Sequence, residues 1–153
     1  MREILFRGKK KDSGEWVCGD LIQLHEEAPY WYILPEGISS EMYEDEPYHF
    51  RQNDVMCSVA LAKVVPETIG QFTGLTDKNG KKIFEGDIVK IHRKYLNAGC
   101  EEDCLYEVIW HKSWYGWALR NLKPTQCCYL SNAVDSEIIG NIHDNKELLG
   151  ENK

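Results

Sequence analysis

Residues 73–91, TGLTDKNGKKIFEGDIVKI, hold the densest turn chemistry in the chain. The Asp-Lys-Asn-Gly stretch at 77–80 has the composition of a reverse turn, because asparagine and glycine adopt positive φ with little strain. A short apolar step at 82–84 leads into a second tight turn, Glu-Gly-Asp at 85–87, after which a strand begins. Two sharp turns this close together, followed by a strand, predict a small and highly curved β-barrel.

The rest of the chain also has the composition of β-structure. Aromatic and β-branched residues predict a strand at 30–34, and residues 4–24 predict a β-hairpin with a bulge or bend at Gly19-Asp20. Pro66 ends the apolar run 55–65 and marks the expected boundary between an N-terminal β-rich lobe, residues 1–66, and a barrel lobe, residues 67–153. Asp144 and Glu147 form a capping-box pattern, which predicts a short C-terminal helical turn. The fold class is therefore mainly β.

An aromatic cluster surrounds the turn between two predicted strands of the second lobe. Alternation places Tyr106 and Val108 on the same face as Trp110, so we expect Trp110 and Trp117 in the core. Trp114 and Tyr115 lie beside the turn glycine, and we expect these two to be exposed. Exposed aromatics at a hairpin end suit a protein or subunit interface, and they also suit stacking on nucleic-acid bases.

Charge limits the second of these uses. The net charge is −7, and residues 1–66 carry 7 basic and 12 acidic side chains while residues 67–153 carry 11 and 13. Neither lobe has the basic balance of a dedicated duplex-DNA binder. A basic strip at 78–94 is a candidate binding surface, with its members Lys78, Lys81, Lys82, Lys90, Arg93 and Lys94. Interleaved carboxylates favour a solvated face instead.

Cysteines and other reactive groups form no recognised site. With no secretory signal, the six cysteines are expected to be thiols. The pairs at 100/104 and 127/128, with His111, are candidate zinc ligands, but their spacing is not that of a zinc site, and we expect no metal and no cofactor. The sequence has no phosphate-binding glycine loop and no HExxH motif. Asp87 is expected to brace its own turn through side-chain to backbone hydrogen bonds rather than to bind a cation with Glu85.

Residues 68–90 resemble the signature of the YopX family of phage and prophage proteins. The opening MREILFR, the VIW of residues 108–110 and the closing segment at 139–145 are similar to the family's start, middle and end. Lys146 follows Asn145 where the family has proline, a departure that affects only the start of the helical turn. The cysteine pairs are not part of the family pattern. The resemblance implies an SH3-like barrel in the second lobe and self-association, and it implies no activity.

We therefore expect a phage-encoded, non-catalytic accessory protein that forms a homo-oligomer and contacts a host or phage protein. Two alternatives remain open: a nucleic-acid-binding accessory protein that uses the basic strip and the exposed aromatics, and a small enzyme with a polar pocket assembled from dispersed Asp, His and Cys residues. No apolar run approaches the roughly 18 residues of a membrane span. We expect no membrane partner and a location in the host cytoplasm.

Overall fold

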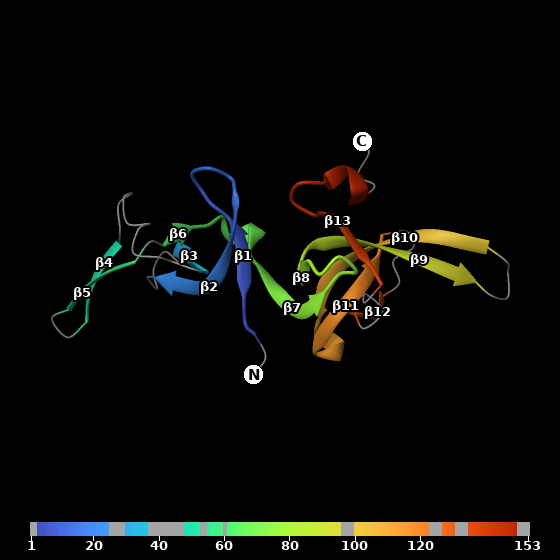
Figure 1. Cartoon of the computed structure of the whole chain (residues 1–153), viewed down its shortest axis with the longest axis horizontal. Coiled ribbons are helices and arrows are strands. Elements are labelled where there is room, and N and C mark those ends of the chain that lie inside the picture. Colours follow the sequence, from blue (N-terminus) through green and yellow to red (C-terminus); the bar gives the residue numbers. More distant parts are fainter. Residues whose placement is uncertain are drawn as a thin grey trace. The chain divides into compact units, whose positions relative to one another are not determined.

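The computed structural model describes residues 3–24, 30–36, 48–52, 55–59, 61–95, 100–122, 127–130 and 135–149. The chain divides into two compact units, Glu3–Gln71 and Phe72–Lys153, each considered by itself below. The sequence placed the boundary at Pro66, which begins the 3-10 helix η2 (Pro66–Thr68) just before the structural division. Antiparallel strands dominate both units, so the predicted mainly β class is confirmed (Figure 1). No helix among the described residues is long and apolar enough to cross a membrane.

Antiparallel strands in the order β6-β3-β2-β1-β7 form the sheet of the first unit. A separate two-stranded sheet pairs β4 with β5. The strands of this unit are β1 (Phe6–Lys9), β2 (Trp16–Leu24), β3 (Tyr30–Pro35), β4 (Tyr48–Gln52), β5 (Val55–Val59) and β6 (Ala62–Lys63). β7 (Gly70–Thr76) runs on into the second unit after pairing its first two residues with β1.

The core of the first unit forms on one face of this sheet. Val17 of β2, Ile33 of β3 and Val64, which follows β6, are buried together there. Gly8 belongs to the same face, and a Cβ at this position would lie 3.1 Å from the Cβ of Val64. Gly19 stays in register with both neighbouring strands, so no bulge interrupts β2 at this position. This glycine instead allows close packing of the two backbones.

The second unit contains an antiparallel sheet in the order β12-β11-β10-β9-β13. Its strands are β9 (Asp87–Tyr95), β10 (Cys100–His111), β11 (Gly116–Asn121), β12 (Cys127–Tyr129) and β13 (Glu137–Asn141). β8 (Lys82–Phe84) pairs with β7, and Ile83 and Leu75 of this hairpin pack into the core of the sheet. The pairing of the described strands leaves the sheet open at β12 and β13, so a closed SH3-like barrel is not confirmed.

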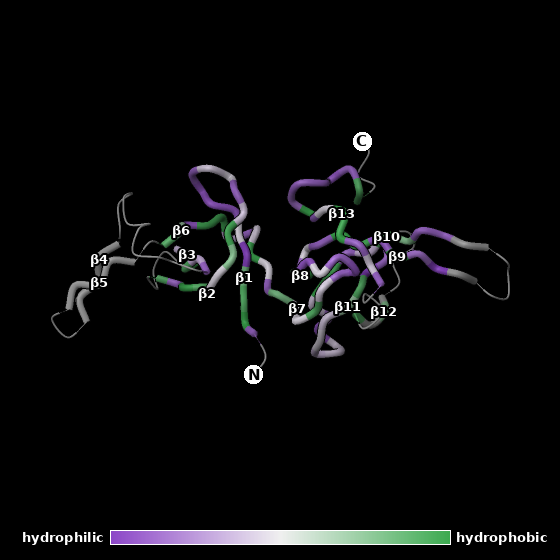
Figure 2. Tube along the Cα trace, viewed as in Figure 1, coloured by the Kyte–Doolittle hydropathy of each residue, from purple (hydrophilic) through white to green (hydrophobic). Residues whose placement is uncertain are grey.

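Alternation along β9 and β10 builds the core of the second unit. The side chains buried together in it belong to Ile83, Val89, Ile91, Cys104, Tyr106, Val108, Leu119 and Leu130. In Figure 2 the outer parts of β9 and β10 are hydrophilic, whereas hydrophobic segments lie along β11 and β13. The 3-10 turn η5 (Lys146–Leu149) follows β13, in agreement with the predicted C-terminal helical turn.

The two predicted turns are present. Gly80 and Gly86 both have φ of +80°, the conformation for which glycine is suited. The buried Asp77 carboxylate accepts hydrogen bonds from the N–H groups of Asn79 (2.8 Å) and Lys81 (2.9 Å) within its own turn. It also accepts the N–H of Ile138 at 3.2 Å, which joins this turn to β13.

The second turn is held in a similar way. The buried Asp87 carboxylate accepts the N–H of Phe84 at 2.8 Å, which confirms the predicted bracing role. Gly86 lies between Phe84 and Asp87 in this turn. Its N–H donates to the carbonyl of Val108, and the Gly86 carbonyl accepts the N–H of Ile142, both at 2.9 Å. The turn therefore contacts the backbone of β10 and the chain that follows β13.

We expect Gly19→Ala to destabilise the protein strongly. A Cβ at position 19 would lie 1.8 Å from the backbone carbonyl oxygen of Leu34, so β2 and β3 would have to separate. The cost is about 3 kcal/mol, at the upper end for overpacking, because backbone must move. Thermal or urea unfolding measures it, and Gly116→Ala is the matched control because its Cβ would meet nothing closer than 3.7 Å. Equal stability of the two variants would contradict the packing argument.

We expect Asp77→Asn to be less stable than the wild type at neutral pH and to lose a part of the acid dependence of stability. Burial alone would raise the pKa of the Asp77 carboxyl, but the backbone donors of Lys81, Ile138 and Asn79 outweigh burial and lower the pKa. The ionised form therefore stabilises the fold above the unfolded pKa of about 3.9, and this contribution is lost as the pH falls through the folded pKa.

The measurement is urea unfolding of both proteins between pH 7 and pH 2. The difference in stability should be about 1–3 kcal/mol at pH 7, because an amide NH₂ would face the Ile138 or Asn79 donors. It should shrink as the pH falls below 4. A difference that stays constant over the whole range would show that the charge of Asp77 contributes nothing.

Candidate interaction surface

Five aromatic rings gather where β10 turns into β11 through the 3-10 helix η3 (Lys112–Trp114). We call this group the aromatic end, and its members are Trp110, His111, Trp114, Tyr115 and Trp117. Three of them are large exposed side chains, with exposed fractions of 45% for Trp110, 39% for Trp114 and 85% for Tyr115. No residue between 109 and 120 carries a carboxylate, although the chain as a whole is acidic. The surface is therefore apolar and weakly basic.

Two contacts between rings hold four residues of the aromatic end in pairs. Trp110 and Trp117 are paired across the two strands and meet edge to face, with centroids 5.1 Å apart. His111 stacks on Trp114 with centroids 4.2 Å apart. Tyr115 adopts the left-handed conformation with φ of 48°, which ends η3. The two ring pairs hold Trp110 and Trp114 in place before any partner binds, which reduces the entropy lost on binding.

The sequence located this surface only in part. Trp114 and Tyr115 are exposed as predicted, and Trp117 packs against the core as predicted. The expectation that Trp110 is buried is wrong. Val108, two residues earlier on the same face, is fully buried, so Trp110 lies at the margin of the core, beside its cross-strand partner Trp117.

The hairpin is anchored at its base by an ion pair. Glu107 of β10 is buried, and its carboxylate accepts two hydrogen bonds from the guanidinium of Arg120 on β11, one of them from Nε at 3.1 Å. These residues are directly paired across the strands. The pair fixes the register that brings Trp110 opposite Trp117.

The predicted basic strip is largely engaged within the protein. Lys78 donates to Glu137 at 2.7 Å, and this contact raises the pKa of Lys78 and lowers the pKa of Glu137. Lys90 lies 3.9 Å from Asp103, and Lys82 lies 5.5 Å from the ring of Phe72. Lys81 is exposed. The strip therefore offers much less available positive charge than its sequence indicates.

Two of the cysteines weighed as metal ligands lie in the hydrophobic core. Cys104 is buried there, and Cys128 packs against it with its sulfur 3.7 Å from Arg93 Nη2. Burial raises the pKa of the neighbouring Tyr106 to about 12. The side chains of Cys100 and Cys127 lie outside the described residues. Among the described residues, no group of three or more His, Cys, Asp or Glu side chains is arranged to hold a metal ion.

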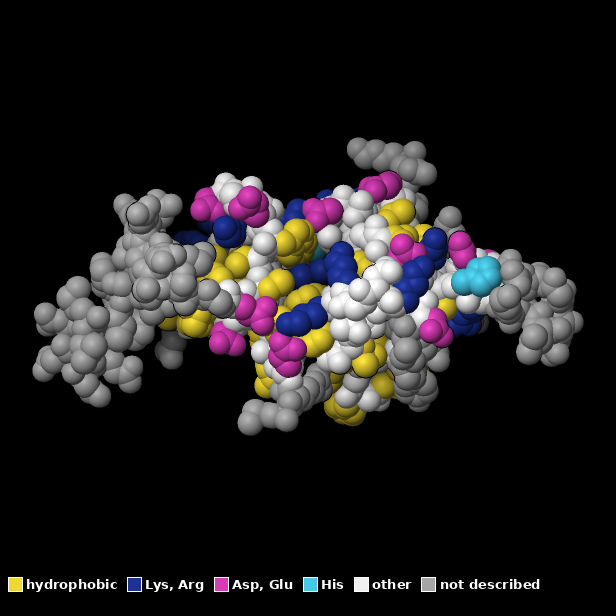
Figure 3. All heavy atoms as spheres, in the orientation of Figure 1, with side chains coloured by type: hydrophobic (Ala, Val, Ile, Leu, Met, Phe, Trp, Pro, Cys, Tyr) yellow, Lys and Arg dark blue, Asp and Glu magenta, His cyan; other side chains and the backbone are white. Residues whose placement is uncertain are grey.

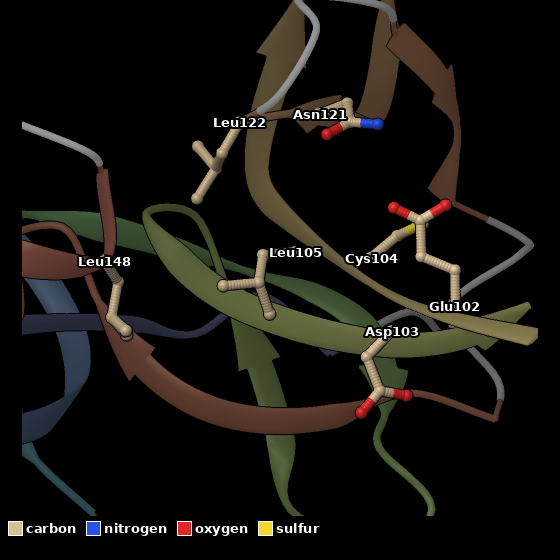
Figure 4. Close-up of a pocket in the computed structure, with 7 residues that line it drawn as sticks. All are labelled: Glu102, Asp103, Cys104, Leu105, Asn121, Leu122 and Leu148. Carbon is tan, nitrogen blue, oxygen red and sulfur yellow. The ribbon is translucent and has the colours of Figure 1, made fainter.

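A shallow pocket of about 300 Å³ lies beside β10 (Figure 4). Leucines line one part of it, and polar groups line the rest; the full lining is Glu102, Asp103, Cys104, Leu105, Asn121, Leu122 and Leu148. Asp103 Oδ1 forms a hydrogen bond with His92 Nδ1 at 2.9 Å, and this hydrogen bond lowers the pKa of Asp103. Figure 4 shows its carboxylate on the opposite side of the strand from Asn121 and Leu122. The lining does not bring an acid and an imidazole together inside the pocket.

A second surface, in the first unit, was not indicated by the sequence. Arg7 and Lys9 lie 4.8 Å and 5.5 Å from the ring centroid of Trp16, and Lys63 lies 3.6 Å from that of Tyr30. We call these five residues the basic face. Lys63 is far from Arg7 and Lys9 in the chain, so only the strand pairing reveals the group.

Comparison with known proteins identifies the family of this chain and a solved structure of similar fold. The model of the family described as YopX protein matches residues 5–150. The crystal structure of protein EF1440 from Enterococcus faecalis is similar, with a TM-score of 0.54 and 21% identity, and the alignment covers 97% of this chain and 99% of that one. At this identity the likeness concerns the fold alone. A search of curated proteins finds no match. Because the family model spans nearly the whole sequence, this chain belongs to the YopX family.

Proposed function

We propose that this protein is a non-catalytic, phage-encoded accessory protein that acts in the host cytoplasm as a homo-oligomeric interaction module. The observation that carries the proposal is the aromatic end, where three large side chains are exposed together. Single exposed apolar residues are ordinary, but clustered tryptophan and tyrosine are the side chains that contribute most to protein interfaces.

A second copy of this chain is the partner that we propose for the aromatic end. The stretch 109–120 lacks carboxylates, so two copies of it bring together apolar rings without repulsion between acidic groups, which the net charge of −7 would cause elsewhere on the surface. The T-shaped pair and the His111–Trp114 stack give each copy a preformed set of rings. A host or phage protein would then contact the assembled oligomer.

The proposal includes an SH3-like arrangement for the second unit and requires no cofactor. The β7–β8 hairpin supports this arrangement, because Leu75 and Ile83 pack into the core of the five-stranded sheet. Asp87 and Asp77, the most deeply buried carboxylates near the turns, accept backbone hydrogen bonds and so have structural roles. These roles leave neither side chain directed at a substrate.

Sedimentation velocity of the full chain tests the proposal. At about 10 µM we expect an oligomer for the wild type, and at least a tenfold weaker association for the double variant Trp114→Ala, Tyr115→Asn, because interface aromatics each contribute about 2 kcal/mol or more. Asparagine is chosen at position 115 because it tolerates the left-handed conformation found there.

Ile4→Ala is the matched control, because Ile4 is 64% exposed and lies in the other unit. It should leave the association unchanged. Circular dichroism verifies that all variants fold. A strict monomer for the wild type at this concentration, or an unchanged mass for the double variant, would refute self-association through the aromatic end.

A further inference from the structure

Lys112 is the positive charge that the aromatic end brings to an interface. The stretch 109–120 contains two cations, Lys112 and Arg120. Arg120 is engaged at the base of the hairpin, where its guanidinium donates to the carboxylate of Glu107. Lys112 is the first residue of η3 and is exposed, and within the described part of the chain its ammonium has neither a carboxylate nor an aromatic ring as a partner. Each copy therefore presents this ammonium at its aromatic end.

Tyr115 ends the turn that Lys112 begins. The N–H of Tyr115 donates to the carbonyl of Lys112 at 3.4 Å, and Tyr115 adopts the left-handed conformation, which is uncommon for a bulky residue. Its side chain is 85% exposed. The two exposed tryptophans of the aromatic end are each paired with a neighbouring ring, whereas no described ring or cation lies against Tyr115. One turn thus holds an ammonium and an uncovered ring without joining them.

Self-association through the aromatic end would bring two such turns together. In an interface formed by the same patch on both copies, every contact occurs twice. Figure 3 shows hydrophobic side chains at the surface around the foot of β11, where the β10–β11 turn lies in Figure 1, while Asp and Glu side chains are spread over other parts of this face. The stretch 109–120 offers no carboxylate to a buried ammonium, and burying an ammonium without a partner is costly. The face of an aromatic ring is the partner that this surface provides.

We propose that the aromatic end recognises a second copy through two reciprocal cation–π contacts, in which Lys112 of each copy lies over the Tyr115 ring of the other. The electron-rich face of a tyrosine ring attracts an ammonium, and the attraction is stronger where water is excluded. This inference rests on the proposed self-association. It adds that the same two side chains, used once in each direction, make a second copy the preferred partner.

Two other accounts of Lys112 predict different results. If the two ammoniums approach each other without a ring between them, they repel, and removing the charge strengthens the association. If Lys112 instead pairs with a carboxylate elsewhere on the second copy, removing the charge weakens the association, but this effect does not depend on the Tyr115 ring. The three accounts therefore differ in the sign of the effect or in its dependence on Tyr115.

Sedimentation velocity of the full chain between about 1 and 100 µM measures the association. We expect Lys112→Gln to weaken it about tenfold, because two cation–π contacts are lost for each pair of copies. Lys112→Arg should remain within about threefold of the wild type, because a guanidinium also binds the face of a ring. Lys146→Gln is the matched control, since it removes the same charge from an exposed lysine of the same unit, and it should associate like the wild type.

A double-mutant cycle identifies the partner of Lys112. In the background of Tyr115→Asn the ring is already absent, so Lys112→Gln should weaken the remaining association less than about twofold. A full tenfold loss in that background would assign Lys112 to another group and overturn the inference. Unchanged or stronger association of Lys112→Gln beside an oligomeric wild type, or an equal loss in Lys146→Gln, would overturn it as well and leave the proposed self-association intact. A strict monomer for the wild type would refute both.

Discussion

The hydrogen bonds of the Asp77 carboxylate join the turn at residues 77–80 to β13 in the second unit. Two of them close the turn that contains Gly80, and the third reaches the backbone of β13. Since β13 pairs with β9, the same carboxylate connects a local turn to one edge of the five-stranded sheet. A buried carboxylate is costly unless backbone donors surround it, and here the donors come from both sides of the contact. Local turn chemistry and long-range sheet pairing therefore stabilise each other.

This arrangement determines where the exposed aromatic rings lie. Gly86 donates to Val108 of β10 and accepts from Ile142, so the second turn holds the middle of the sheet. Beyond Val108 the cover of the core becomes partial: Trp117 still packs against the core, whereas Trp110, paired with it across the strands, is 45% exposed. Trp110 packs edge to face on Trp117. The aromatic end therefore lies at the margin of the core, with Trp117 packed on the core and Trp110, Trp114 and Tyr115 exposed.

Features determined by neighbouring residues could be predicted, and features determined by distant ones could not. The glycines at 80 and 86, the bracing by Asp87 and the exposure of Trp114 and Tyr115 follow from local chemistry. The exposure of Trp110 depends on how far the core extends along β10. Alternation indicates which face a side chain is on, but not where along the strand the core ends. At Gly140 the missing Cβ leaves room for the Asn145 side chain, which accepts the N–H of Asn141.

The distribution of charge is another feature that residues distant in the sequence determine. A list of lysines in the sequence points to residues 78–94, yet folding brings Glu137 to Lys78 and Asp103 to Lys90, so much of that charge is neutralised at contact distance. Folding also brings Lys63 to Lys9 and Lys11, which concentrates charge where the sequence shows only a short run. Coulomb energies fall off with distance and with screening, so the pairing of charges in space, rather than the net charge of −7, decides which surface attracts an anion.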